Sequence, residues 1–274
     1  MGSRAAHSST SSAIASANRP HFGSGASPAE RAALMAGRLP HRRASTRPRD
    51  AGMRHERELR LAGFHRIAGI DEVGRGCLAG PVVAAAVVLP EQHRIKGLRD
   101  SKVLTRLARE QLYERILDRA DGVGVGCVEV EVIDRINILQ ATKLAMRDAL
   151  TRLWPAPDHL VIDALTLPAV ALPQRAIIDG DAISASIAAA SIVAKVTRDR
   201  ICAEFDARYP AYGFARNKGY GTRRHYDALL VDGPCEWHRR SFAPIRMLVA
   251  GTQLPLDLVF EGVARLEDEE LTSD

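Results

Sequence analysis

Two adjacent carboxylates, Asp71 and Glu72, follow the apolar segment that begins at Ile67 and precede Gly74-Arg75-Gly76. Side chains alternate along a strand, so the two acids share a face only where the chain kinks, as at a strand end or bulge. Carboxylates this close repel each other unless a cation lies between them, which favours a divalent metal with oxygen ligands. Glycine allows close backbone approach to a ligand, and arginine suits phosphate. An acidic strand end in an ordinary turn is the alternative for an Asp-Glu pair alone.

Two more acids follow apolar segments later in the chain. Asp163 ends the segment from His159, and Asp181 comes soon after the segment from Arg175 to Ile178. Each acid alone is more often a turn residue or a helix cap. If all three segments are strands of one sheet, their acids gather at one rim. Four carboxylates there need cations, and two divalent ions about 3.5–4 Å apart serve in-line phosphoryl transfer. All-oxygen ligands favour Mg²⁺ or Mn²⁺ over zinc.

The elements that position these acids are predicted from apolar periodicity and from capping and breaking residues. We predict helices at about 53–61, 105–119, 133–153 and 184–209, and strands at about 66–71, 81–89, 122–131, 159–163 and 175–178. This succession of elements indicates an α/β fold with a mixed sheet.

Composition excludes several classes of protein. The 274 residues are 46% hydrophobic, which is ordinary for a folded domain with a sizeable core. No apolar run approaches the roughly 18–20 residues of a membrane helix. The four cysteines lack C-x-x-C spacing and paired histidines, which argues against a zinc site and a disulfide framework and fits a reducing compartment. We therefore expect a soluble, cytoplasmic protein.

The net charge of +5 is unevenly distributed along the chain. Residues 1–60 hold eleven arginines against four acids, and residues 61–256 hold 26 basic against 22 acidic residues. Residues 257–274 hold seven acids against one arginine. We expect a mildly basic body between a disordered basic arm, 1–51, and an acidic tail, 251–274. A tether, an organelle transit peptide and an upstream start codon that extends the true protein all remain open for the arm.

Six motifs then occur in one order along the chain: Asp71-Glu72-Val73-Gly74-Arg75-Gly76, Asp100-Ser101-Lys102, Ile162-Asp163, Gly180-Asp181, Ala189 to Asp199, and Asn217-Lys218-Gly219-Tyr220-Gly221-Thr222. Each motif alone is weak, but the set resembles bacterial ribonuclease HII over about residues 52–248. The resemblance implies an RNase H-like fold, in which helices flank a mixed central sheet. It implies a catalytic domain at 52–250, with a C-terminal helical substrate-binding lobe at about 210–250.

The resemblance also implies an activity. This is an endoribonuclease that cuts the RNA strand of RNA–DNA hybrids and incises 5′ of ribonucleotides embedded in duplex DNA. Its products carry 5′-phosphate and 3′-hydroxyl ends. Two Mg²⁺ or Mn²⁺ ions are implied as cofactors. Their ligands in the family, which are also its catalytic residues, fall on Asp71, Glu72, Asp163 and Asp181.

Substrate-binding roles follow from the same resemblance. Gly74, Arg75 and Gly76 read the ribose 2′-hydroxyl and the adjacent phosphate, because that hydroxyl is what distinguishes RNA from DNA at one site. Tyr220 packs on the deoxyribose next to the ribonucleotide; a core tyrosine with its hydroxyl satisfied is the alternative.

Basic residues supply weaker candidates for substrate contacts. Lys102 and Lys218 are assigned to the substrate, as is Lys195, for which a structural ion pair is an equal explanation. The basic groups 223–225 and 238–240 either face the duplex from a helical lobe or form a solvated surface.

The chain departs from the family's sequence pattern at one position near the fourth acid. Asp179 stands where the family commonly has lysine, which adds negative charge near the metals. The sister family, ribonuclease HIII, has a folded N-terminal domain and a glutamate as fourth acid, so Asp181 favours HII.

A junction resolvase and a non-catalytic hybrid-binding protein are the rival functions. Nothing in the sequence indicates more than a monomer, and contact with a sliding clamp is left open.

Overall fold

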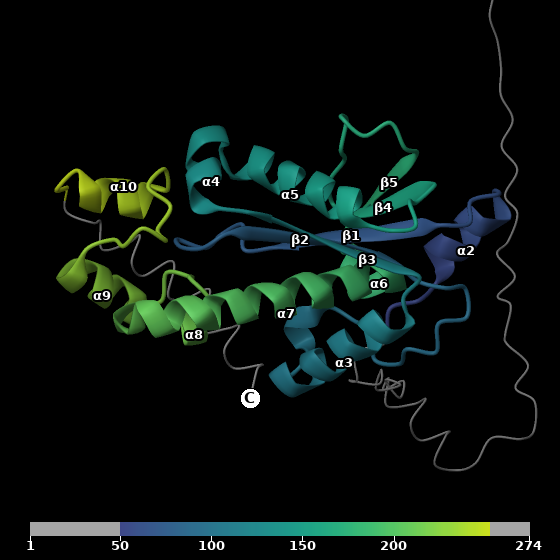
Figure 1. Ribbon diagram of the computed structural model, residues 1–274, viewed down its shortest axis with the longest axis horizontal. Coiled ribbons are helices and arrows are strands. Elements are labelled where there is room, and N and C mark those ends of the chain that lie inside the picture. Colours follow the sequence, from purple (N-terminus) through teal and green to yellow (C-terminus); the bar gives the residue numbers. More distant parts are fainter. Residues whose placement is uncertain (1–49, 253–274) are drawn as a thin grey trace, which may run out of the picture. The chain divides into compact units, whose positions relative to one another are not determined.

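The computed structural model describes residues 50–252 (Figure 1). The predicted arm at 1–51 and the predicted acidic tail at 251–274 therefore lie outside the described residues, apart from residues 50–51 and 251–252. Within the described range, no helix has both the length and the apolar character needed to cross a membrane.

A mixed sheet, as predicted, forms the centre of the described residues. Its five strands in the described range are β1 (Ile67–Val73), β2 (Val82–Val88), β3 (Gly122–Val128), β4 (His159–Asp163) and β5 (Gln174–Ile177), in the order β3-β2-β1-β4-β5. β2 pairs antiparallel with β1 and β3, while β1, β4 and β5 run parallel. The β1–β4 pairing ends at Ile70 and Ile162, but β1 pairs with β2 as far as Val73. The last residues of β1 thus run past β4 at an open edge.

Helices cover both faces of this sheet (Figure 1). The helices of residues 50–252 are α2 (Arg54–Leu61), α3 (Arg106–Arg119), α4 (Val130–Ile136), α5 (Ile138–Arg152), α6 (Gly180–Ile183), α7 (Ala185–Arg208), α8 (Phe214–Asn217), α9 (Arg223–Asp232) and α10 (Ala243–Val249), with short 3-10 turns η1 (Ser101–Val103) and η2 (Pro210–Tyr212). Of these, α3 and α7 pack on one face of the sheet and α4 and α5 on the other. The helices predicted at 53–61, 105–119 and 184–209 are confirmed within one or two residues.

The single helix predicted at 133–153 is wrong, because the chain breaks there into α4 and α5. Asn137 lies between them with φ of +65°. Asparagine adopts this region more readily than most residues, and its side-chain oxygen accepts a hydrogen bond from the Gln140 N–H at 3.1 Å. A helix cap in the middle of a periodic pattern thus divides the predicted element.

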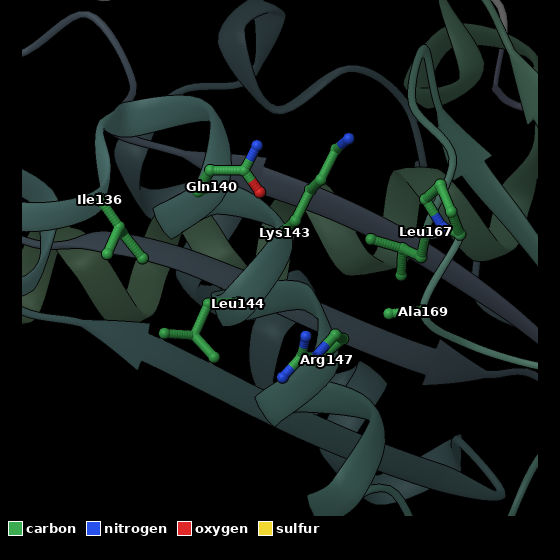
Figure 2. Close-up of a pocket in the computed structure, with 8 residues that line it drawn as sticks. Ile136, Gln140, Lys143, Leu144, Arg147, Leu167 and Ala169 are labelled. Atoms are coloured by element: carbon green, nitrogen blue, oxygen red, sulfur yellow. The ribbon is translucent and has the colours of Figure 1, made fainter.

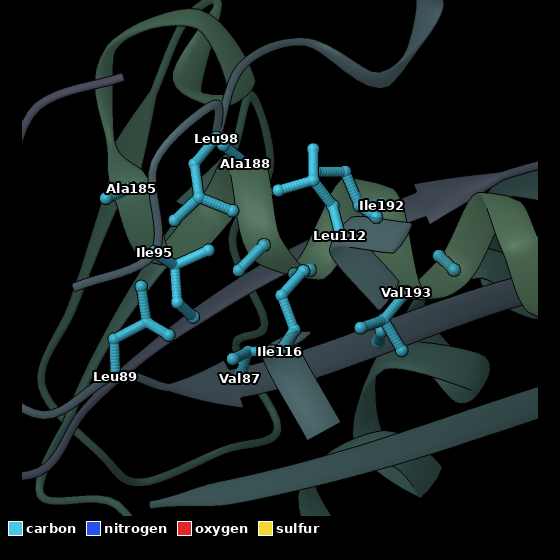
Figure 3. Packing of buried hydrophobic residues seen from close by; sticks show 14 of the residues in the cluster. Val87, Leu89, Ile95, Leu98, Leu112, Ile116, Ala185, Ala188, Ile192 and Val193 are labelled. Atoms are coloured by element: carbon cyan, nitrogen blue, oxygen red, sulfur yellow. The ribbon is translucent and has the colours of Figure 1, made fainter. Parts of the chain in front are cut away.

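The core is built on β2, whose seven residues are all buried. Valine and alanine make up this strand, so helices approach it closely on both faces. Val87 lies beside Ile116 of α3, and both belong to one buried cluster with Ala188 and Ile192 of α7 (Figure 3). The other face carries α4 and α5.

α7 lies directly against β1 and is anchored at its first residues. A Cβ added at Gly69 of β1 would lie 2.1 Å from the carbonyl carbon of Ser186, so only glycine fits there. The buried Glu56 of α2 accepts hydrogen bonds from the Ser184 hydroxyl at 2.7 Å and the Ser186 N–H at 3.0 Å. These contacts fix the position of α7 relative to the sheet.

The predicted C-terminal lobe has a hydrophobic core of its own. The core also includes Leu78 and Ala79 from the loop after β1, and its other buried members are Val130, Cys202, Tyr212, Phe214, Tyr226, Leu229, Trp237 and Ile245. The lobe therefore packs on the loop that leaves β1.

The basic surface expected at 223–225 and 238–240 is only partly confirmed. Arg223 and Arg224 are exposed. His225, His238 and Arg239 are buried, so for them the predicted surface role is wrong. The two imidazoles contact each other through their Nε2 atoms at 2.9 Å, and burial lowers the pKa of both. Basic residue types alone did not distinguish these buried groups from a solvated face.

Candidate active site

All four predicted acids line one cavity of about 250 Å³ at the open edge of β1. The residues around it are Asp71, Glu72, Val73, Ser101, Lys102, Arg109, Asp163, Asp181, Ser191, Lys195 and Tyr220. They come from β1, β4, η1, α3, α6, α7 and the loop between α8 and α9. The fold thus brings together segments that are far apart in the sequence.

Asp71 and Glu72 reach the cavity without the kink or bulge that the sequence suggested. Their register with β2 is regular, opposite Ala85 and Ala84. By strand alternation the two side chains leave opposite faces of β1. Both line the same cavity because β1 runs past the end of its pairing with β4 there.

Asp163 and Asp181 approach from the neighbouring strands. Asp163 is the last residue of β4, and its Oδ1 accepts a hydrogen bond from the Gly180 N–H at 2.8 Å. Asp181 is the second residue of α6, which follows β5. Asp179 is exposed in the left-handed region and is not among the lining residues, so its carboxylate does not border the cavity.

Burial and mutual repulsion raise the pKa of three of these carboxyl groups. Burial, followed by the Glu72 charge, raises the pKa of Asp71 well above its ordinary value. Burial also raises the pKa of Glu72, although the adjacent Arg75 acts in the opposite direction. Burial, Asp100 and Asp163 raise the pKa of Asp181 to about 6. A cation in the cavity would oppose each of these shifts.

The donor atoms in the cavity fit a hard divalent cation. All four candidate ligands are carboxylates, and the Glu72 Oε2 atom is buried without a hydrogen-bond partner. Oxygen-only donor sets favour Mg²⁺ or Mn²⁺. Within residues 50–252, no three acid, imidazole or thiol groups already lie close enough to hold a metal ion. Asp163 and Asp181 are only half-buried, so their carboxylates are less confined than that of Asp71.

The loop after β1 carries the predicted ribose-reading triplet. Gly74 has φ of +91°, and a Cβ there would lie 2.3 Å from Arg198 Nε, so only glycine fits. Arg75 is exposed and its Nη1 contacts Glu72 Oε1 at 3.1 Å. A Cβ at Gly76 would lie 3.9 Å from the Tyr220 ring. The triplet and the tyrosine are therefore neighbours.

Tyr220 is not a core residue, which removes the alternative raised for it. It lies half-buried in the loop between α8 and α9 and lines the cavity with the acids. Its carbonyl oxygen contacts His225 Nδ1 at 2.7 Å. The ring thus borders the cavity while its backbone is held by the lobe.

The three predicted lysines differ in position. Lys102 and Lys195 line the cavity, and Lys195 Nζ also contacts Asp199 Oδ1 at 2.9 Å, which is the ion pair considered as its alternative. Lys218 is not among the lining residues, and its ammonium donates to the Ala215 carbonyl.

Several cavity residues were not singled out from the sequence. Ser191 hydrogen-bonds Asp71, and its Oγ lies 3.0 Å from that of Ser101. Arg109 donates to the Ser101 carbonyl at 2.9 Å and lies 3.9 Å from Asp199. Both serines belong to recognised motifs, yet a serine on a buried helix face usually indicates packing. Arg109 lies outside every motif, so no sequence signal marked it.

A larger cavity, of about 490 Å³, lies between α5 and the loop at 165–170 (Figure 2). Its lining residues are Ile136, Gln140, Lys143, Leu144, Arg147, Leu167, Pro168 and Ala169. No carboxylate lines it, so its size does not make it a candidate for metal-dependent chemistry.

Comparison with known proteins agrees with this geometry. The family model described as Ribonuclease HII matches residues 68–245. The chain belongs to the ribonuclease HII family. Among curated relatives, Ribonuclease HII of Bacillus mycoides (strain KBAB4) is 56% identical over 196 residues, 72% of this chain and 76% of that protein. Ribonuclease HII of Geobacillus thermodenitrificans (strain NG80-2) is 59% identical over 194 residues, 71% of this chain and 74% of that protein.

Solved structures support the RNase H-like fold. Ribonuclease H2 from Pyrococcus horikoshii OT3 has a TM-score of 0.56 and 28% identity, covering 68% of this chain and 98% of that chain. RNase HII of Archaeoglobus fulgidus, solved as a PCNA:RNase HII complex, has a TM-score of 0.58 and 26% identity, covering 70% and 98%. As a ribonuclease HII, the chain is an endoribonuclease that acts on RNA–DNA hybrids.

Proposed function

We propose that this ribonuclease HII also incises duplex DNA 5′ of a single embedded ribonucleotide, by two-metal hydrolysis that leaves 5′-phosphate and 3′-hydroxyl ends. The observation that supports this most is the shared cavity. The four acids line it together with Tyr220, and the loop of Gly74 to Gly76 lies beside that ring.

The four acids, Asp71, Glu72, Asp163 and Asp181, hold two Mg²⁺ or Mn²⁺ ions in this proposal. When bound, such ions supply an activated water and stabilise the leaving oxygen. The chain therefore needs no nucleophilic side chain. Its own contribution is to orient the carboxylates: the Glu72 N–H donates to Asp71 Oδ1 at 2.8 Å, and the Gly180 N–H does the same for Asp163.

Recognition of the ribonucleotide belongs to the loop after β1 and to Tyr220. The backbone of Gly74 to Gly76 approaches the 2′-hydroxyl, and Arg75 approaches the adjacent phosphate. The Tyr220 ring packs on the next deoxyribose and so detects the junction. Lys102 and Lys195, which line the cavity, contact phosphate, whereas Lys218 supports its own loop.

The location, oligomeric state and protein partners of the chain are further predictions. We expect a cytoplasmic monomer that acts in the removal of ribonucleotides from DNA. RNase HII of Archaeoglobus fulgidus has been solved in a complex with PCNA, and clamp contact by this chain stays a prediction. A junction resolvase would cut all-DNA substrates, and a non-catalytic protein would bind hybrids without turnover.

An incision assay tests the proposal. The substrates are duplex DNA with one ribonucleotide and the same duplex without it, each with Mg²⁺ or Mn²⁺. We expect metal-dependent cutting 5′ of the ribonucleotide only, and a loss of at least about a thousandfold in Asp71→Asn, since a metal ligand that orients the reaction is removed. Asp118→Asn, on an exposed carboxylate, is the matched control.

Two results would overturn the proposal. One is no cutting of the ribonucleotide substrate by a folded wild-type protein that still cuts a uniform hybrid. The other is equal cutting of the all-DNA duplex, which would favour a resolvase-like activity.

A further inference from the structure

A first backbone segment, residues 74–81, lies beside the cavity, and a second and a third, residues 217–220 and 235–239, lie against it. The Leu78 N–H donates to the Gly219 carbonyl at 2.8 Å, and the Gly80 N–H donates to the Trp237 carbonyl at 2.9 Å. A Cβ at Gly219 would lie 2.5 Å from the Ala79 carbonyl oxygen, so no side chain separates the first two segments. The first segment begins with the ribose-reading triplet, and the second ends at Tyr220.

Arg239 is fully buried, and its guanidinium donates hydrogen bonds to the first segment, residues 74–81. Its Nη2 donates to the Gly74 carbonyl at 2.6 Å and its Nη1 to the Arg75 carbonyl at 2.9 Å. Its Nε and Nη2 both donate to the Gly80 carbonyl, at 2.9 and 2.7 Å. One side chain thus joins the two ends of the loop.

Arg198, from α7, is also fully buried and joins the first segment to the second. Its Nε and Nη2 donate to the Pro81 and Ala79 carbonyls at 3.0 and 3.1 Å. Its Nη1 donates to the Lys218 carbonyl at 2.8 Å, two residues before Tyr220. Its side chain also fills the space where a Cβ at Gly74 would lie.

Burying two charged guanidiniums is not the most stable way to attach the lobe to the sheet. Within residues 50–252, the hydrogen bonds of both guanidiniums go to backbone carbonyls, and neither forms an ion pair with a carboxylate. Burial lowers the pKa of Arg239 to about 10, whereas the pKa of Arg198 is raised, because its burial is outweighed by neighbouring groups such as Cys77. Both groups stay charged at neutral pH. Burying a charge without a counter-charge is unfavourable, so apolar side chains would attach the lobe with a greater gain in stability.

We infer that Arg198 and Arg239 are positioning residues for ribonucleotide recognition, which fix the distance between the ribose-reading loop at Gly74–Gly76 and the junction-sensing Tyr220. The inference rests on the proposed function. Guanidinium suits this task because it directs five donors in one rigid plane, whereas an ammonium offers three donors on a single atom. Lysine therefore keeps the charge and loses the geometry.

The test compares Arg198→Lys and Arg239→Lys with wild type on two substrates. On duplex DNA with a single ribonucleotide, the loop and Tyr220 must engage adjacent sugars together. On a uniform RNA–DNA hybrid no deoxyribose follows the ribose in the cut strand, so their separation matters less. Arg60→Lys is the matched control, because Arg60 donates to the Leu89 carbonyl at the opposite end of β2.

We expect each variant to lower kcat/KM on the single-ribonucleotide substrate by about tenfold more than on the hybrid. Mn²⁺ binding, measured by calorimetry, stays within about threefold of wild type, because no metal ligand is changed. An equal loss on both substrates, or no loss, would overturn the inference. Failure of the proposed function would instead appear in wild type, as an absence of single-ribonucleotide incision.

A measurement on wild type keeps the inference testable if both variants misfold. Amide hydrogen exchange of the free protein should protect Leu78, Ala79 and Gly80 as strongly as β1, because the loop is preformed. Rapid exchange at these amides would overturn the inference, since a mobile loop has no fixed distance to Tyr220.

Discussion

Asp71 serves the proposed chemistry at a cost to the stability of the metal-free protein. Asp71 is 6% exposed, and its burial, followed by the charge of Glu72, raises its pKa. Without a cation, the charged form of this carboxylate is unfavourable, because the fold removes it from water and places it near another acid. The same carboxylate should therefore have opposite effects on stability with and without metal.

We predict that Asp71→Asn raises the free energy of unfolding in EDTA by about 1 kcal/mol, because a buried charge beside another acid is removed. Wild type should gain about 2.7 kcal/mol when Mn²⁺ is present at a hundredfold its Kd, and the variant should gain little. Denaturant titrations with EDTA and with Mn²⁺ measure both quantities. A variant that is less stable in EDTA, or that gains as much from Mn²⁺ as wild type, would contradict this account.

At the scale of residues, the sequence predicted those with an unusual chemical type and missed those with an ordinary one. Asp163 and Asp181 were assigned because each follows an apolar segment, as Asp71 does, so that the acids could gather at one rim, and the resemblance gave them the same role. Ser191 and Arg239 were not assigned, since a buried serine resembles packing and an arginine resembles surface. Their partners are distant in sequence, so only the folded chain reveals their roles.

At the scale of elements, the position of α7 on β1 depends on one missing side chain. Gly69 lies where Ser186 of α7 leaves no room for a Cβ, and α7 carries Ser191 and Lys195 into the cavity. The sequence predicted both elements within two residues. It did not predict this approach, because a glycine within a strand is also compatible with a bulge.

We predict that Gly69→Ala lowers the free energy of unfolding by about 3 kcal/mol, because the clash is with helix backbone that cannot yield. Hybrid cleavage should fall as well, since α7 moves away from Asp71. Gly52→Ala is the control, as nothing lies within 4 Å of its added Cβ. Urea unfolding and cleavage rates measure the two effects; unchanged stability in Gly69→Ala would show that α7 is free to adjust.

At the scale of the whole described body, two pairs of basic residues lie on different helices, and only one of these helices belongs to the lobe. The exposed Arg223 and Arg224 belong to α9 of the lobe that borders the cavity, whereas Lys143 and Arg147 of α5 lie by the second cavity. If the lobe holds the duplex, its arginines contribute through phosphate and not through the bases.

We predict that the double variant Arg223→Ala/Arg224→Ala binds all duplexes more weakly and reduces the slope of log Kd against log salt by about 2. Its preference for a ribonucleotide should not change. Lys143→Ala/Arg147→Ala is the control pair and should keep the wild-type slope. Fluorescence anisotropy over a salt series measures the slopes. Equal slopes for the lobe variant and wild type would place the duplex elsewhere.

α7 has a further consequence, because one helix passes both the proposed cutting site and the proposed reading site. It is fixed to Glu56 at its start, borders the acids through Ser191 and supports the reading loop through Arg198. A helix advances about 1.5 Å per residue and hardly stretches, so the number of α7 residues between the two sites sets their separation. The offset between the cleaved bond and the recognised sugar is then a length built into the protein, and changing it would require residues to be inserted into or deleted from α7.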